Sequence, residues 1–111
     1  MLPASAAAQV TSDLVDFNLT ESVSTWPTQY HISTSGTGYA SYRWLDSPNK
    51  ATVISANACT DLSFFGSSSY GIGDTTYHNL YLGGAGQCFQ VRGRTTAGSG
   101  SMVNHDGRIQ R

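Results

Sequence analysis

Short runs in which apolar and polar residues alternate occur along most of the chain, and they predict β-strands. From residue 39 to 45, Tyr42 and Trp44 share one face of such a run, and Ser41 and Arg43 share the other. Because successive side chains of a strand point to opposite faces, this period of two predicts a strand that buries Tyr42 and Trp44.

A second run, from residue 87 to 96, shows the same alternation. Phe89 and Val91 fall on one face. The other face has Cys88, Gln90, Arg92 and Arg94 at alternate positions. The first face is expected to pack in the core with Tyr42 and Trp44.

Seven further segments are predicted as strands from their β-branched and aromatic residues. They are residues 9–19, 28–35, 52–55, 59–65, 75–82, 101–104 and 107–110. Residues 9–19 also fit a helical period, but their Val, Thr and Phe favour a strand. The last two segments are expected to form a terminal hairpin over residues 105–107.

Turn signals separate these segments about every ten residues. They include Trp26-Pro27 and the Gly-, Ser-, Pro- or Asn-rich stretches at residues 35–38, 46–50, 83–86 and 97–100, and residues 66–74 are expected to form a loop. About eight short strands with this spacing predict an all-β fold, a small antiparallel β-sandwich or barrel.

Length and charge limit the number of domains and the classes of partner that we expect. The 111 residues have room for one domain, expected over residues 10–111, and the chain has a single lysine and a single glutamate, so long helices are not expected. The net charge of −1 gives no reason to expect a nucleic acid partner. Five acidic and two basic residues in 1–61 give −3, and four basic and two acidic residues in 62–111 give +2. This split favours docking of the first strand on the C-terminal strands of its own chain or of a neighbouring chain, and the alternative is scattered surface charge.

Cys59 and Cys88 are the only cysteines, and each lies in a predicted strand. Without short spacing or companion histidine ligands they do not resemble a metal or redox pair. They predict one disulfide, which closes a loop of about 30 residues and contributes roughly 3.5 kcal/mol on the chain-entropy model. A disulfide is expected in an oxidising compartment.

Residues 1–9 are expected to be flexible or the remnant of a secretory signal peptide. Leu-Pro-Ala-Ser-Ala-Ala-Ala resembles the region before a signal-peptidase site, although a basic and an apolar region do not precede it. The alternative is an alanine-rich start on a chain that is not exported. Membrane insertion is not expected, because no segment approaches the roughly 20 apolar residues of a membrane span.

The sequence predicts no catalytic residue, metal site or cofactor. His31, His78 and His105 lie in separate segments without ligand spacing, and Glu21 lies in a predicted loop. A small secreted hydrolase would require His78, Arg92 and an acidic group in one cleft.

Aromatic residues are the best candidates for binding. Tyrosine and tryptophan supply contact area at low entropic cost in protein interfaces and sugar-binding surfaces. The candidate binding residues are Trp26, Tyr39, Tyr70, Tyr77 and Tyr81, and the Phe64-Phe65 pair also lies in an exposed-looking place. The alternative is that they form the core of a chain with few leucines and isoleucines.

The first predicted strand is a candidate for pairing with a partner. In this hypothesis the strand joins the edge of a partner's sheet, and the partner's pockets take up Val15, Phe17 and Leu19. The partner is another protein or a second copy of the chain. The alternative is an ordinary strand that completes its own sandwich.

These observations predict a non-enzymatic secreted β-domain that binds another protein or a surface glycan, as an adaptor subunit of an extracellular assembly. In composition, though not in any motif, the chain is similar to small single-disulfide β-proteins exported by high-GC bacteria. Two alternatives stay open: a phage virion structural protein, either a capsid decoration or a tail subunit, and a small secreted hydrolase.

Overall fold

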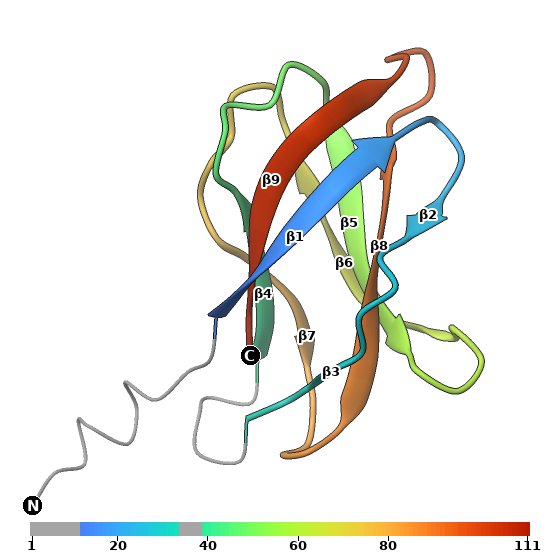
Figure 1. Ribbon diagram of the computed structural model, residues 1–111, viewed down its shortest axis with the longest axis vertical. Helices are drawn as coiled ribbons and strands as arrows, with labels where there is room; N and C mark the ends of the chain where they lie inside the picture. Colours follow the sequence, from blue (N-terminus) through green and yellow to red (C-terminus); the bar gives the residue numbers. More distant parts are fainter. Residues whose placement is uncertain (1–11, 34–38) are drawn as a thin grey trace, which may run out of the picture.

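The computed structural model describes residues 12–33 and 39–111 and is all-β (Figure 1). The nine strands of these residues are β1 Ser12–Leu19, β2 Ser24–Thr25, β3 Tyr30–His31, β4 Tyr39–Trp44, β5 Thr52–Ala58, β6 Phe64–Tyr70, β7 His78–Leu82, β8 Cys88–Thr95 and β9 Met102–Gln110. The described residues contain no helix, and hence none that would cross a membrane.

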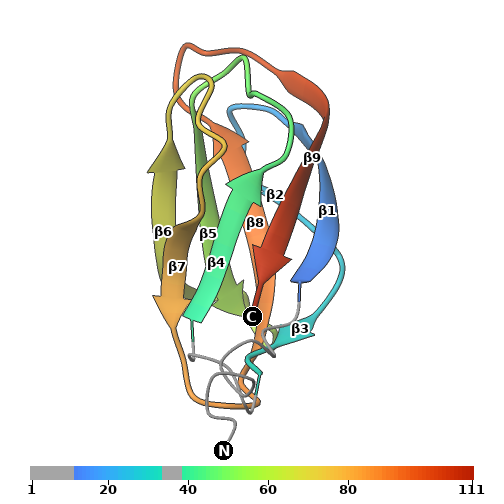
Figure 2. The same ribbon diagram turned by 90° about the vertical axis from the view of Figure 1, so that its left-hand side faces the viewer.

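The strands form two antiparallel sheets, which confirms the predicted antiparallel sandwich. One sheet has the order β1-β9-β4-β7 and the other the order β2-β8-β5-β6, with β3 also paired to β8. Figure 2 shows β4, β7 and β9 in front of β5 and β8. Every connection except β5–β6 and β2–β3 passes from one sheet to the other, and this strand order is that of a jelly roll.

The pairings nest around the β5–β6 hairpin. β4 pairs with β7, both β2 and β3 pair with β8, and β1 pairs with β9, so each successive pair encloses the one before. β9 also pairs with β4, and β8 with β5, which curls the nested hairpins into two layers.

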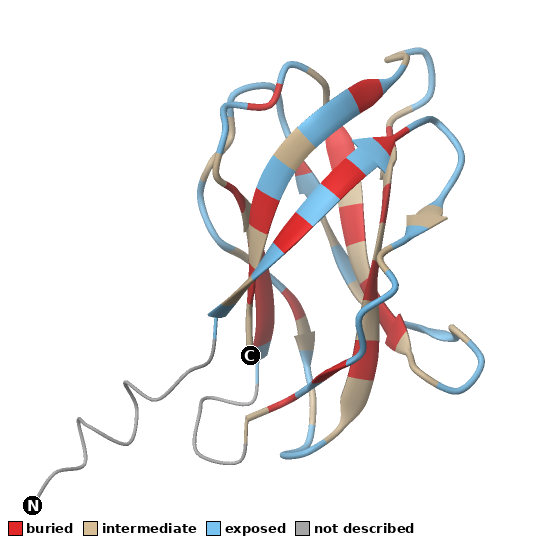
Figure 3. Cartoon of the chain, in the orientation of Figure 1, coloured by how far each residue is buried: buried red, intermediate tan, exposed pale blue. Residues whose placement is uncertain are grey.

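The inner faces of both sheets follow the predicted alternation (Figure 3). On β4, Tyr42 and Trp44 are fully buried, and on β8 the buried residues include Phe89 and Val91, as predicted. The core therefore lies between the sheets, and the alternate residues of β8 face outward.

Polar groups in the core are largely paired. The indole Nε1 of Trp44 donates to Thr52 Oγ1 at 3.0 Å, and the Tyr70 hydroxyl donates to the backbone oxygen of Tyr42. The Tyr42 hydroxyl is the exception: it is buried and has no hydrogen-bond partner among the residues that the structure describes.

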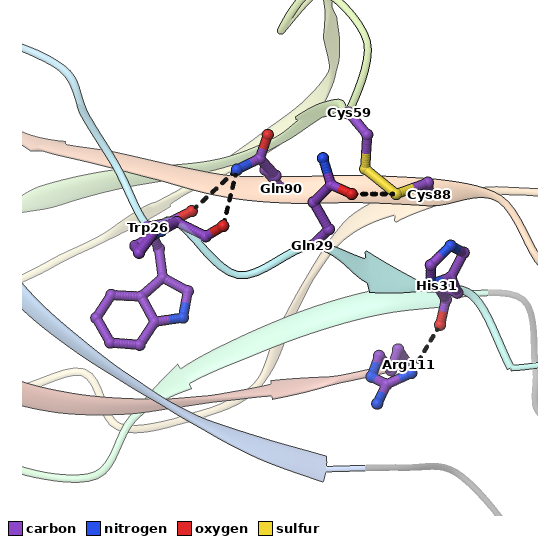
Figure 4. The surroundings of a disulfide bond; sticks show 8 residues. Trp26, Gln29, His31, Cys59, Cys88, Gln90 and Arg111 are labelled. Carbon is purple, nitrogen blue, oxygen red and sulfur yellow. Dashed lines mark hydrogen bonds between the residues drawn. A yellow bond between two sulfur atoms is a disulfide. The ribbon is translucent and has the colours of Figure 1, made fainter.

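The predicted disulfide is present. Cys59 follows β5, Cys88 begins β8, and their Cα atoms are 5.6 Å apart (Figure 4). Near this bond, the Gln90 side chain donates to the backbone oxygens of Trp26 and Pro27 at 3.4 and 3.3 Å. The disulfide and Gln90 thus join β8 to β5 on one side and to the β2–β3 connection on the other.

The first strand docks on the C-terminal strand of its own chain. β1 pairs with β9 over most of its length, and the Arg111 guanidinium contacts the Asp13 carboxylate at 2.8 Å. Arg108 Nη1 donates to Ser12 Oγ at 3.1 Å. The uneven charge of the two halves therefore supports docking within the chain, one of the two arrangements that it favours.

The prediction of a strand over residues 59–65 and a loop over residues 66–74 is wrong except at residues 64–65 and 71–74. The chain turns between Ala58 and Ser63, with Leu62 at a φ of 60°, and β6 then occupies the first part of the predicted loop, up to Tyr70. Gly66 was interpreted as part of a turn. It is a glycine because a Cβ at this position would collide with the carbonyl oxygen of Leu80. The glycine allows close packing and does not mark a turn.

The predicted terminal hairpin is also wrong, because β9 is one continuous strand through residues 105–107. Gly107 lies against the Tyr42 ring, where a Cβ would collide with it. A register irregularity falls earlier, where Asn104 has a φ of 53° and its N–H donates to the Asn18 side chain at 2.8 Å.

The two-residue strand β2 lies in a segment predicted as a connection. The expectations for residues 1–9 and for the turn at 35–38 lie outside the described residues.

Candidate functional site

A groove of about 390 Å³ lies on the outer face of the β2-β8-β5-β6 sheet. Its lining residues are Val23, Val53, Ser55, Asn57, Leu62, Phe64, Ser67, Arg92, Gly93 and Arg94. Pockets of this size accommodate small ligands. We refer to it as the β8 groove.

The strand register arranges the β8 groove in rows across the sheet. Arg92 of β8 lies opposite Ser55 of β5, which lies opposite Ser67 of β6. Arg94 is opposite Val53 in the next row, towards the end of β8. A row of two hydroxyls, those of Ser55 and Ser67, therefore runs across the middle of the groove. We refer to it as the hydroxyl row, and Arg92 lies at its β8 end.

On the other side of this row, Asn57 lies opposite Phe64, where a bulge shifts the β5–β6 register. Asn57 is 4% exposed, and its Nδ2 donates to the backbone oxygen of Leu62 at 3.0 Å. Its Oδ1 accepts from Ser55 Oγ at 2.6 Å. These two bonds hold the Ser55 hydroxyl in one orientation and tie the β5–β6 turn to the groove.

Arg92 and Arg94 give the groove its charge. Arg92 Nε donates to Thr25 Oγ1 at 3.0 Å, and Arg94 Nη1 donates to the backbone oxygen of Thr95 at 3.3 Å. Neither ion pair found among residues 12–33 and 39–111 involves these arginines. Each guanidinium thus keeps donors for an anionic group, which it can bind through two parallel hydrogen bonds.

Apolar surface borders the charged and hydroxyl groups. Phe64 is 66% exposed and Val23 is 48% exposed, and the half-buried Val53 lies opposite Arg94. Exposed apolar side chains beside cations are typical of sites that bind a ligand with both an apolar face and a negative charge.

The structure does not gather Trp26, Tyr39, Tyr70, Tyr77 and Tyr81, which the sequence nominated for binding, into one aromatic cluster. None of the ring contacts among the described residues joins two of Trp26, Tyr39, Tyr70, Tyr77 and Tyr81. Tyr70 is 1% exposed, and burial raises the pKa of its hydroxyl, so it is a core residue and not part of a binding surface.

Of the other four aromatic candidates, Tyr39 and Tyr81 lie on the paired strands β4 and β7, where Tyr81 is opposite Ala40, and Trp26 and Tyr77 lie elsewhere. Trp26 is half-buried, and its Nε1 donates to the Tyr30 hydroxyl at 2.9 Å. Tyr81 stacks on Phe65 with ring centroids 4.4 Å apart. Tyr39 and Tyr77 are each 38% exposed, and the guanidinium carbon of Arg43 in β4 lies 5.7 Å from the centroid of the Tyr77 ring.

The candidate partner strand is β1. Val15, Phe17 and Leu19 are at most 3% exposed and belong to the core between the sheets. In this arrangement they complete the sandwich of their own chain and are not available to a partner's pockets.

His78 and Asp74 form a close pair, with His78 Nε2 and Asp74 Oδ2 2.7 Å apart. Hydrogen bonds from the side chain and backbone N–H of Thr76, together with that from His78, lower the pKa of Asp74 to about 2. Arg92 is in the opposite sheet, so the cluster of His78, Arg92 and an acid in one cleft does not form.

Within the described part of the chain, no group of three or more His, Cys, Asp or Glu side chains is placed to hold a metal ion. Comparisons of the chain with protein-family models, with curated proteins and with solved structures found no match.

Sequence reasoning placed Arg92 and Arg94 on one strand face but missed most of the rest of the β8 groove. The signal for the arginines was the alternation over residues 87–96. Phe64 was also indicated, as part of an aromatic pair in an exposed-looking place, and it is 66% exposed. Ser67 carried no such signal, because its contribution depends on how β6 pairs with β5.

Proposed function

We propose that this protein is an exported, non-enzymatic binding domain and that the β8 groove is its ligand site. The observation that carries the proposal is the pair of arginines in the groove, which have no carboxylate partner among the described residues and lie beside exposed apolar side chains. A guanidinium is costly to order on a surface unless it serves an interaction, and arginine is enriched where proteins bind their partners.

Export is supported by the disulfide. Cys59 and Cys88 are bonded, and such bonds persist mainly in oxidising compartments. The bond also braces the sheet that carries the β8 groove, because it joins the end of β5 to the start of β8. A braced site binds with a smaller loss of conformational entropy.

The test compares two double variants on a panel of immobilised glycans and peptides. Arg92→Ala with Arg94→Ala removes the charge of the β8 groove. Arg43→Ala with Arg108→Ala is the matched control, because these two arginines lie opposite each other on the other sheet and carry the same charge. We expect the wild type and the control to bind the same ligands, and the groove variant to lose them.

Thermal unfolding of all three proteins shows whether each variant is folded. Unchanged binding by a folded groove variant would place the ligand site elsewhere on the molecule.

A structural subunit of a phage virion is the second candidate function. The specific observation in its favour is the strand order, since jelly rolls form viral capsid domains as well as lectin domains. A fold shared by many functions gives weaker support than a site does. Light scattering of the purified protein at increasing concentration, followed by electron microscopy, tests this candidate: ordered trimers or arrays would favour the virion subunit, and a monomer would favour the binding domain.

A further inference from the structure

We infer that the β8 groove binds an anionic saccharide, one whose sugar rings carry a carboxylate or a sulfate. This inference rests on the proposed function and names the ligand class for the same site. Three features of the groove each match one part of such a ligand.

The first feature is the pair of cations. Arg92 and Arg94 alternate with the buried Gly93, so both project from the same face of β8. A carboxylate or a sulfate accepts two parallel hydrogen bonds from one guanidinium. Two such groups on one strand favour a ligand with more than one negative charge along its length.

The second feature is the hydroxyl row. Ser55 gives its own proton to Asn57, so its oxygen faces a ligand as a hydrogen-bond acceptor. Opposite Ser55, Ser67 is exposed, and its hydroxyl makes no side-chain hydrogen bond with the described residues. A saccharide presents many hydroxyls in a small area, and these donate and accept along such a row.

The third feature is the apolar border. Val53 lies on one side of the hydroxyl row and Phe64 on the other. A pyranose ring has a face of C–H groups that packs against an aromatic or aliphatic side chain, whereas its hydroxyls point outward from the ring edge. An acidic peptide would satisfy the arginines, but it lacks a dense set of hydroxyls to match the row between these two side chains.

The experiment titrates ¹⁵N-labelled, oxidised protein with four probes and follows the backbone amides by NMR. The probes are a short oligogalacturonate, which carries carboxylates, a heparin-derived oligosaccharide, which carries sulfates, a neutral oligogalactan, and an oligo-aspartate peptide. We expect at least one anionic saccharide to shift the amides of Ser55, Ser67, Arg92 and Arg94 in a saturable way. The neutral saccharide is expected to bind far more weakly.

Variants then test the groove itself. Arg92→Ala is expected to weaken the anionic saccharide about tenfold or more, and Arg92→Lys to give an intermediate loss because lysine keeps the charge without the bidentate geometry. The Arg43→Ala, Arg108→Ala control is expected to bind as the wild type does. Saturable binding of only the carboxylated or only the sulfated probe supports the inference and identifies which anion the groove takes.

Other outcomes overturn it. If only the peptide binds in the groove, or if no anionic saccharide shifts the groove amides, the saccharide inference is wrong. Equal losses in the groove variant and in the control would mean that the probes respond to overall charge, which also overturns it. The proposed function fails separately, when the ligands found on the wider panel bind independently of Arg92 and Arg94.

Discussion

The buried hydroxyl of Tyr42 predicts that a substitution in the centre of the core increases stability. Tyr42 is fully buried, and its hydroxyl has no partner among the described residues, so Tyr42→Phe removes an uncompensated polar group. Burial of such a group costs about 1 to 3 kcal/mol. The void left by one oxygen costs on the order of 0.5 kcal/mol. We therefore expect Tyr42→Phe to be more stable than the wild type by about 1 kcal/mol.

Tyr70→Phe is the matched comparison, because it removes the same atom from a neighbouring ring. The two ring centroids are 5.8 Å apart, but the Tyr70 hydroxyl donates to the backbone oxygen of Tyr42. Loss of that hydrogen bond is expected to cost about 1 kcal/mol. The two variants should then differ by about 2 kcal/mol, or about 8 °C in melting temperature for a domain of this size. Thermal and urea unfolding of the oxidised proteins measure the difference. An equal loss of stability in both variants would show that the Tyr42 hydroxyl has a partner, and would refute the reasoning.

Three further predictions concern stability. Trp44→Ala should lower the free energy of unfolding in urea by about 3 to 5 kcal/mol, because the whole side chain is buried, and an unchanged value would mean that Trp44 is outside the core. Asp74→Asn should be less stable than the wild type above about pH 4. The folded pKa of Asp74 is about 2, below its ordinary value of 3.8, because Thr76 hydrogen-bonds the carboxylate, so this contribution is lost as the pH falls from 4 to 2. Urea unfolding across this range checks the sign, and a difference at pH 2 as large as that at pH 5 would contradict it. Thiol titration of the unfolded, unreduced protein should detect no free thiol, and reduction of Cys59–Cys88 should lower stability by about 3.5 kcal/mol.

The sequence predicted the sandwich well where the strands are buried on one face. The alternation around Tyr42 and Trp44, and around Phe89 and Val91, is strong because each apolar residue there faces the core. β6 was missed because its outward serines and Gly66 resemble a loop. Local chemistry does not reveal that a glycine is required by a strand from the other sheet.

The candidate site was less predictable for a related reason. The alternation of β8 is local and placed Arg92 and Arg94 on one face, whereas the position of Ser55, Ser67 and Phe64 beside them depends on non-local pairing and on a bulge. Aromatic content likewise does not distinguish a core residue from an exposed one. Tyr70 was nominated for binding from a predicted loop, although it ends β6 inside the core.

The nested strand pairing has a consequence for the order in which the chain folds. The β5–β6 hairpin closes through a turn between Ala58 and Ser63, whereas β1 must find β9 across most of the chain. Because the entropic cost of loop closure rises with loop length, we expect the hairpin to form first and the β1–β9 pair to form last. In the oxidised chain the Cys59–Cys88 bond holds the start of β8 beside the end of β5 from the outset. The loop that must close before β8 pairs with β5 is therefore shorter. Stopped-flow refolding should accordingly be faster for the oxidised chain than for the reduced one, and equal rates would mean that β8 docks after the slowest step.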